Sequence, residues 1–275
     1  RKREIAALPQ PLKLFVGRVH TGRGAFRGTG HQGGKPREIH VLHRGDITQP
    51  GQRVRPGAVD LFTPSEDYFE LHDAHVESDR RIALSRWILD RNNPLTWRSI
   101  VNRLWQHHFG RGIVDTPNDF GRMGQRPSHP ELLDWLAVQF RDNGQSLKGL
   151  HRLIVTSRTY RQESATREHP AGVDGGNRLL WRMNRRRLDA ESIRDSVLWL
   201  ADSLDRKMYG PSFQDFVIEK PEHSPHYQYH LHDPLDPRSH RRSIYRFLVR
   251  SQQQPFMTTL DCADPSMIVD KRSET

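Results

Sequence analysis

The sequence predicts a mainly α-helical protein with a small β element. Between residues 78 and 205, apolar side chains recur at spacings of three and four, the period of one helix face. Residues that start and stop helices stand at the ends of these stretches. Two segments, near 38–44 and 242–250, have the β-branched content typical of strands. We therefore expect an irregular helical domain in which strands contribute little.

The composition is that of a folded chain without a membrane span. Hydrophobic residues make up 34% of the 275 residues, and six Trp and eleven Phe supply large core side chains. No apolar run reaches the roughly 18 residues of a spanning helix. A single cysteine, Cys262, excludes an intrachain disulfide and a cysteine-based zinc site. The formal charge of +10 would suit a polyanion, but the arginines that carry most of it are spread along the chain, so we expect no nucleic-acid partner.

The chain is expected to divide at about residue 77. Residues 1–77 indicate an irregular N-terminal segment with a short strand and a linker, because Gly and Pro are frequent and helical periodicity is missing. Residues 78–275 indicate a helical domain. The chain starts without Met or a signal-like segment and ends on a polar stub, so we expect a piece of a longer protein, truncated at the C-terminal end of this domain.

The densest helical signal lies at residues 93–112. Asn93 can cap the first turn, Pro94 suits the first helical position, and Gly110 can adopt the left-handed conformation that ends many helices. His108 falls in the middle of the apolar face, so we predict that it is buried and hydrogen-bonded to a carbonyl or a carboxylate. His107 falls at the border, and the two imidazoles cannot bind one ion. The apolar face consists of Trp97, Ile100, Val101, Leu104, Trp105 and Phe109.

A long turn, residues 111–128, follows this helix. Glycines let its backbone bend, and apolar side chains of its own favour packing over free movement. We expect it to pack against the helix, with Asp119 accepting hydrogen bonds from N–H groups of the turn and with Arg122 ordered. Ser128 and Glu131 have the spacing of a capping box for the next helix. The later elements predicted are helices over about 130–142, 146–160 and part of 177–205, and a loop over 209–240.

Four long motifs stand in the order and spacing of one family: WQHHFGRGIVDTPNDFGRMGQRPSHPELLDWLA, LKGLHRLIVTSRTYRQES, NRLLWRMNRRRLDAESIRDS and RRSIYRFLVRS. Over about residues 38–270 the chain resembles the planctomycete-type domain of unknown function at the C-terminal end of large proteins that carry an N-terminal cytochrome-c-like module. The resemblance implies export to the periplasm or cell surface, association with other domains of the same polypeptide, including the haem-bearing module, and no established activity. It also implies a further helical stretch after Thr275. The haem motif CxxCH is absent, so no cofactor is assigned to this chain.

One group of polar residues is a candidate catalytic site, at the end of helix 93–110 and on the turn: His107, Asp119, Arg122 and His129. Imidazoles facing an acidic loop could bind a metal or transfer protons. In the alternative, Asp119 and Arg122 hold the turn by hydrogen bonds and His108 is a core residue.

A second group points to a structural polar network. Glu191 and Asp195 are one helical turn apart and repel each other, so a cation should lie between them. Arg187, four residues before Glu191, is the simplest choice, with Arg194 alongside; a metal ion is the alternative. Asn102 and His108 are assigned to structural polar roles as well.

A histidine-rich tract between residues 223 and 240 offers metal-site candidates in His226, His230 and His232. The tract lacks the helical frame that spaces two imidazoles on one face, so we assign no metal site and expect a surface loop.

Two functions remain open. The preferred hypothesis is a non-catalytic helical module of an exported protein that docks a haem-bearing or carbohydrate-related partner. The alternative is a hydrolase or redox enzyme with its site between helix 93–110 and turn 111–128. Convergence of His107, Asp119 and His129 around a cavity would favour the enzyme.

Overall fold

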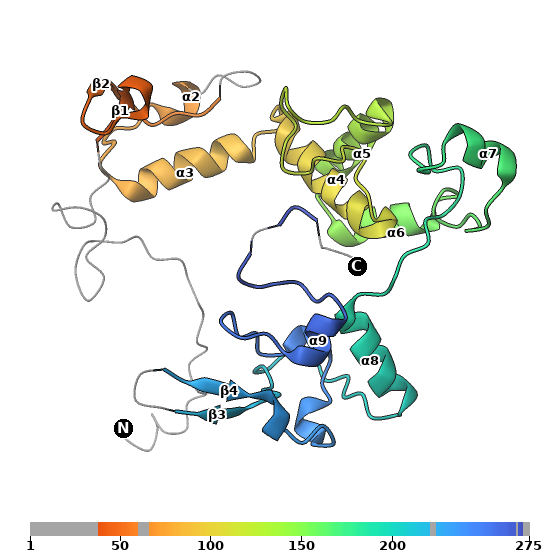
Figure 1. The fold of residues 1–275 in the computed structure, drawn as a ribbon. Coiled ribbons are helices and arrows are strands. Elements are labelled where there is room, and N and C mark those ends of the chain that lie inside the picture. Colours follow the sequence, from red (N-terminus) through yellow and green to blue (C-terminus); the bar gives the residue numbers. More distant parts are fainter. Residues whose placement is uncertain (1–37, 60–65, 221–223, 268, 272–275) are drawn as a thin grey trace, which may run out of the picture. The chain divides into compact units, whose positions relative to one another are not determined.

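The computed structural model describes residues 38–59, 66–220, 224–267 and 269–271 (Figure 1). Helices dominate these residues, and the strands form only two short antiparallel hairpins. The prediction of a mainly helical domain with a small β element is confirmed. Within these ranges, no helix combines the length and apolar character needed to cross a membrane. Much of the predicted N-terminal segment, residues 1–77, lies outside the described residues.

The described residues fall into two compact units. Helices α4, Pro94–Phe109, and α5, Pro130–Asp142, are divided between them. A domain boundary at residue 77 remains a prediction. The first unit is formed by the residues up to Ile100 with Leu136–Gln145, and the second by Val101–Trp135 with the residues from Ser146 onward.

The described part of the first unit begins with a hairpin of β1, Ile39–Leu42, and β2, Pro50–Val54. The strand predicted near 38–44 is therefore confirmed. Two helices follow, α2, Glu66–Phe69, and α3, Glu77–Ile88. Ala83 is the buried residue of α3, whereas most of the other apolar side chains of that helix are partly or largely exposed.

The start of α4 agrees with its capping signals. The Asn93 side chain accepts from the N–H of Leu95 at 3.1 Å and donates to the carbonyl of Trp87 at 3.2 Å. Asn93 is 2% exposed, so its two partners satisfy an otherwise costly buried amide. Trp97 packs at 6.4 Å, between ring centroids, from Phe140 of α5. The cap and the aromatic pair together fix where the helix begins.

The helical part of the second unit contains the rest of α4, α6, Leu147–Thr156, and α7, Glu168–Val173. Gly110 ends α4 with a φ of +79°, as predicted. The Ser146 side chain caps α6 by accepting from the N–H of Gly149 at 3.1 Å. The most deeply buried apolar side chains here are Val101, Trp105, Phe109, Ile113, Val114, Leu133, Leu150 and Ile154.

The remaining part of the second unit contains α8, Ala190–Leu200, and α9, Pro255–Thr259. Asp189 caps α8 by accepting from the N–H of Ser192 at 2.7 Å. A second hairpin pairs β3, Val217–Glu219, with β4, His226–Gln228. The ring of Phe216 makes edge contacts with those of Tyr227, Tyr229 and Phe247. Short 3-10 helices cover His43–Gly45, Tyr229–Leu231, Pro237–Ser239 and Ser243–Tyr245.

Two predictions for this part of the chain are wrong. The segment 242–250 is not a strand: the turn Ser243–Tyr245 interrupts it, and it pairs with only one neighbour, through the bridge between Phe213 and Arg246. An extended segment with a single bridge lacks the ladder of hydrogen bonds that makes a sheet. The segment 209–240 is not entirely loop, because it contains the β3–β4 hairpin.

Candidate functional site

The turn after α4 is fixed by one buried amide. The Asn102 side chain, 0% exposed, donates to the carbonyl of Val114 at 2.9 Å and accepts from the N–H of the same residue at 2.8 Å. An asparagine amide has both a donor and an acceptor, so it can pair with the N–H and the carbonyl of one residue as a residue of a neighbouring antiparallel strand does. A Cβ on Gly112 would lie 2.4 Å from the Val114 carbonyl oxygen, so glycine is required there. The backbone of the turn therefore comes close to α4, and at that point its N–H and carbonyl groups at Val114 are both hydrogen-bonded.

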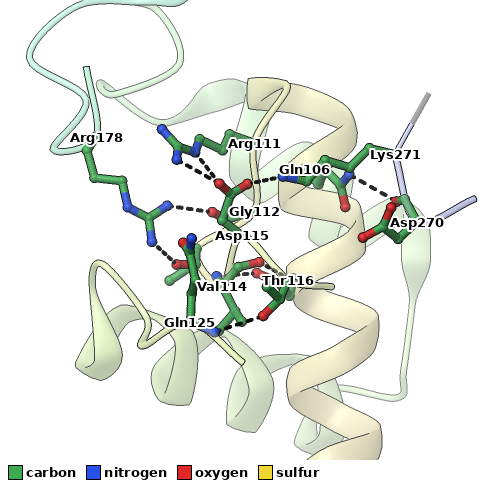
Figure 2. A network of polar contacts seen from close by, with 12 residues as sticks. Gln106, Arg111, Gly112, Val114, Asp115, Thr116, Gln125, Arg178, Asp270 and Lys271 are labelled. Atoms are coloured by element: carbon green, nitrogen blue, oxygen red, sulfur yellow. Dashed lines mark hydrogen bonds and ion pairs between the residues drawn. The ribbon is translucent and has the colours of Figure 1, made fainter. Parts of the chain in front are cut away.

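Asp115 is the charged centre of the site (Figure 2). One carboxylate oxygen accepts from Nε and Nη2 of Arg111, both at 2.7 Å, and the other pairs with Nζ of Lys271. Burial alone would raise the pKa of Asp115, which is 9% exposed, but the hydrogen bonds and charges of Arg111 and Lys271 outweigh it and lower that pKa. The carboxylate is thus held charged, with both oxygens engaged.

Segments distant in sequence close the same site (Figure 2). Arg178 donates to the carbonyls of Gly112 at 3.3 Å and Ile113 at 3.1 Å. Burial lowers the pKa of Arg178, and the positive charge of Arg111 lowers it further. Gln106 of α4 donates to the carbonyl of Asp270 at 3.3 Å, next to Lys271. Residues 178 and 270–271 therefore hold the turn from outside.

The distal half of the turn has its own hydrogen bonds. Asp119 accepts from the N–H of Gly121 at 2.8 Å, as expected for an acid in a tight turn. Thr116 donates to the Asp119 carbonyl at 2.8 Å and accepts from the N–H of Gln125 at 3.0 Å. Arg122 is exposed and has no polar partner among the described residues, so it does not hold the turn.

The histidine candidates do not come together. His107 is exposed, and its carbonyl accepts from Arg186 at 2.5 Å. His129 contacts the hydroxyl of Ser128 at 2.9 Å. That hydroxyl lies 3.3 Å from the carbonyl of Ile113, and no capping-box bond to the start of α5 accompanies it among the described contacts. Within the described part of the chain, no three His, Cys, Asp or Glu side chains are grouped as metal ligands.

His108 is partly exposed, so the prediction of a buried histidine is wrong. Its Nε2 lies 2.7 Å from Nδ1 of His151 on α6, and its ring meets that of Tyr160 edge-on. The partner is an imidazole of α6 and not the carbonyl or carboxylate that was predicted. Burial lowers the pKa of His108, and the neighbouring charges of His151, His107 and Arg186 lower it further.

Part of the ion-pair network predicted for α8 is present: Arg194 and Asp195 form an ion pair at 3.5 Å, and each also binds the segment 239–243. Arg194 donates to the carbonyls of Ser239 at 2.6 Å and Arg241 at 3.0 Å, and Asp195 accepts from the N–H and hydroxyl of Ser243 at 2.8 and 2.7 Å. These bonds tie α8 to the segment 239–243. Arg187, which was expected between Glu191 and Asp195, forms an ion pair with Asp261 at 3.3 Å.

One buried pair of opposite charges was not predicted from the sequence. Asp215 and Arg246 are 7% and 8% exposed, and their closest N–O distance is 3.9 Å. Asp215 Oδ1 and Arg246 Nε have no hydrogen-bond partner in the described structure. Burial raises the pKa of Asp215 despite the charges of Arg246 and Arg194. The only sequence signal is an acid between Phe213 and Phe216, which is too common to single out.

The histidine tract borders a groove. His226 lies in β4, His230 in the following 3-10 helix and His232 just after it. His232 lines a groove of about 760 Å³ together with Tyr209, Phe213 and other residues of the segments 205–217 and 231–241. The three imidazoles form no group of metal ligands in the described structure.

Comparison with known proteins identifies the family. A model described as PSD1, protein of unknown function (DUF1553), matches residues 80–275. Neither curated proteins nor solved structures gave a match. The matched range contains the turn, the Asp115 network and the groove, and it confirms the resemblance drawn from the sequence motifs. The chain therefore belongs to the PSD1 (DUF1553) family, whose domain is of unknown function.

Proposed function

We propose that this domain is a non-catalytic helical module that docks onto a haem-bearing, c-type cytochrome module of a larger exported polypeptide. The observation that carries the proposal is the C-terminal end of α8, where Val197, Trp199 and Leu200 are 56%, 63% and 78% exposed. Val197 and Leu200 are one helical turn apart, and Trp199 lies next to Leu200. Grouped apolar side chains of this size are typical of interaction surfaces.

The polar contacts of the turn support docking over catalysis. The amide of Asn102 and the carboxylate of Asp115 make their hydrogen bonds inside the fold. Acid–base catalysis between α4 and the turn would need polar side chains directed at one reacting atom. The candidates His107, Asp119 and His129 have separate surroundings instead.

Export and the haem-bearing partner rest on the four family-like motifs. Attachment of a c-type haem needs two cysteines and a histidine in one motif, and this chain has Cys262 alone, so the haem would belong to the linked module. The chain's charge of +10 favours a partner with an acidic face.

Cross-linking of the intact polypeptide tests the proposal. Lys207 lies seven residues after Leu200, so its Cα can be no more than about 25 Å from the exposed end of α8, within range of a long cross-linker. We expect a cross-link from Lys207 to the haem-bearing module, lost when Trp199→Ser and Leu200→Ser are combined. The control is Val173→Ser, because Val173 is 77% exposed on α7 and lies outside this surface.

Cross-links that persist in the double variant would contradict the proposal, as would the absence of any cross-link to another module. Links to a carbohydrate-related module instead would reassign the partner.

A further inference from the structure

Tyr209 has a strained backbone at the rim of the groove. Its φ is +63°, in the left-handed region that residues other than glycine rarely adopt, and its side chain is 80% exposed. Strain of this kind and exposure of a large ring both cost free energy, and a strained residue persists where its surroundings enforce it. Tyr209 is such a residue, because its neighbours hold the backbone on both sides.

The peptide groups of Tyr209 are held by two stacked side chains. Its N–H donates to the hydroxyl of Tyr245 at 2.7 Å, and its carbonyl accepts from Nη2 of Arg241 at 2.6 Å. The Arg241 guanidinium lies over the Tyr245 ring, 4.0 Å from its centroid. Arg241 also donates to the carbonyls of Lys207 and Pro211, on either side. The loop is therefore fixed while the Tyr209 ring remains accessible.

The groove below this ring has a mixed lining. Its volume is about 760 Å³, and the largely buried rings of Phe213 and Phe216, 7% and 5% exposed, form part of its wall. Ser212, Gln214 and His232 add groups that donate or accept hydrogen bonds. The charged lining residues balance, with three cations and three carboxylates: Lys207, Arg238 and Arg241 against Asp205, Asp233 and Asp236.

We propose that this groove binds a neutral oligosaccharide, with one sugar ring stacked on Tyr209. A sugar ring has an apolar C–H face and a rim of hydroxyls, which match an accessible aromatic face above donors and acceptors. A nucleic acid would need an excess of positive charge along the groove, and the lining provides none. The proposal does not depend on docking at the end of α8.

Native affinity electrophoresis tests the proposal with three neutral polysaccharides: laminarin, xylan and galactomannan. We expect at least one of them to retard the 275-residue chain. Tyr209→Ala should weaken that binding about tenfold, the size of effect expected for an aromatic anchor. Tyr209→Phe should retain it, since the ring face and not the hydroxyl is used.

Two controls separate binding from folding. Phe256→Ala removes another exposed aromatic of the same unit, in α9 and outside the groove lining, and should leave the retardation unchanged. Tyr209→Ala should melt at the same temperature as the parent chain, because the ring is 80% exposed.

Three results would overturn the proposal. The first is that none of the three polysaccharides retards the chain, and the second is that Tyr209→Ala and the parent are retarded equally. Heparin and a 20-nucleotide poly(dT) serve as polyanion probes, and the third result is binding to one of these alone. The last result would assign the groove to a polyanion. Loss of the Lys207 cross-link in the α8 variants bears on docking alone, so the two proposals can fail separately.

Discussion

Two buried polar regions of the second unit are built in opposite ways. In the turn after α4, the Asn102 amide hydrogen-bonds both the N–H and the carbonyl of Val114. The two carboxylate oxygens of Asp115 bind the side chains of Arg111 and Lys271. Asp215 and Arg246 are about as well buried, yet their closest N–O distance is 3.9 Å and each keeps an unpartnered atom within the described structure.

The comparison shows that partners, and not burial, decide what a buried charge contributes. Burial acts on both carboxylates in the same direction, raising the pKa. Arg111 and Lys271 reverse that effect for Asp115, whereas Arg246 and Arg194 do not reverse it for Asp215. The turn is therefore a stabilising element, and the Asp215–Arg246 pair is one that the fold tolerates.

The largest effect is expected at Asn102. Asn102→Ala leaves the N–H and carbonyl of Val114 buried without partners and opens a cavity, so we expect a loss of about 3 kcal/mol in the free energy of unfolding. Urea denaturation measures it. Asn143→Ala is the control, since that amide donates at an exposed helix end and should change stability by less than about 1 kcal/mol. If Asn102→Ala lost no more stability than the control, the Asn102 hydrogen bonds would not stabilise the turn, and the contrast with the Asp215–Arg246 pair would fail.

A somewhat smaller effect is expected at Gly112. A methyl group there meets the Val114 carbonyl oxygen at 2.4 Å and the Asn102 amide at 2.8 Å. The turn must move away from α4, and we expect Gly112→Ala to cost about 2 kcal/mol in thermal or urea unfolding. Gly172→Ala, in α7 with no atom within 4 Å of the new Cβ, should be neutral or slightly stabilising. Equal behaviour of the two variants would contradict close packing of the turn.

The sequence predicted the local parts of this turn but not its long-range partners. Asn93 and Gly110 mark the ends of α4 by themselves, because caps depend on neighbours in sequence. Asn102 shares the helix face of Trp105 and Phe109, and a polar residue at such a position requires a partner. The identity of that partner does not follow from the spacing of residues in the sequence.

The partners that close the site come from far along the chain. Lys271 lies 156 residues from Asp115, and Arg178 lies 65 residues from Ile113. Helical periodicity carries no information about contacts at these separations. The pair Arg111–Asp115, four residues apart, is the part that spacing could have indicated.

A smaller effect is expected at Asp115, with a defined pH dependence. Asp115→Asn should lower stability by about 1–2 kcal/mol at pH 7, limited because Arg111 and Lys271 are 45% and 39% exposed. The folded pKa of Asp115 is lowered, so its stabilisation is present above the ordinary value of 3.8 and is lost as pH falls through the lowered pKa. The deficit of the variant should therefore shrink below pH 3.8. A deficit independent of pH would assign the effect to shape and not to charge.

The smallest effect, with the opposite pH trend, is expected at Asp215. Its folded pKa is raised, so its contribution is fully present below the ordinary value of 3.8 and declines as pH rises through the raised pKa. The parent should therefore lose stability between about pH 4 and 7, whereas Asp215→Asn, which does not titrate, should not. At pH 7 the free energies of unfolding of the two proteins should differ by less than about 1 kcal/mol. Urea unfolding at several pH values measures this. A strong loss at pH 7 would show that Asp215 and Arg246 form a stabilising pair, and the contrast with Asp115 would disappear.

Hydrogen exchange at the Val114 amide tests the central claim most directly, because that N–H depends on a side chain and not on a helix. If the turn is part of the folded core, Val114 should exchange only by global unfolding, with the same protection as the amide of Trp105 inside α4. The Gly121 amide, bonded to the partly exposed Asp119, provides the fast reference. Exchange of Val114 as fast as that of Gly121 would show that the turn opens independently of α4, which contradicts the account.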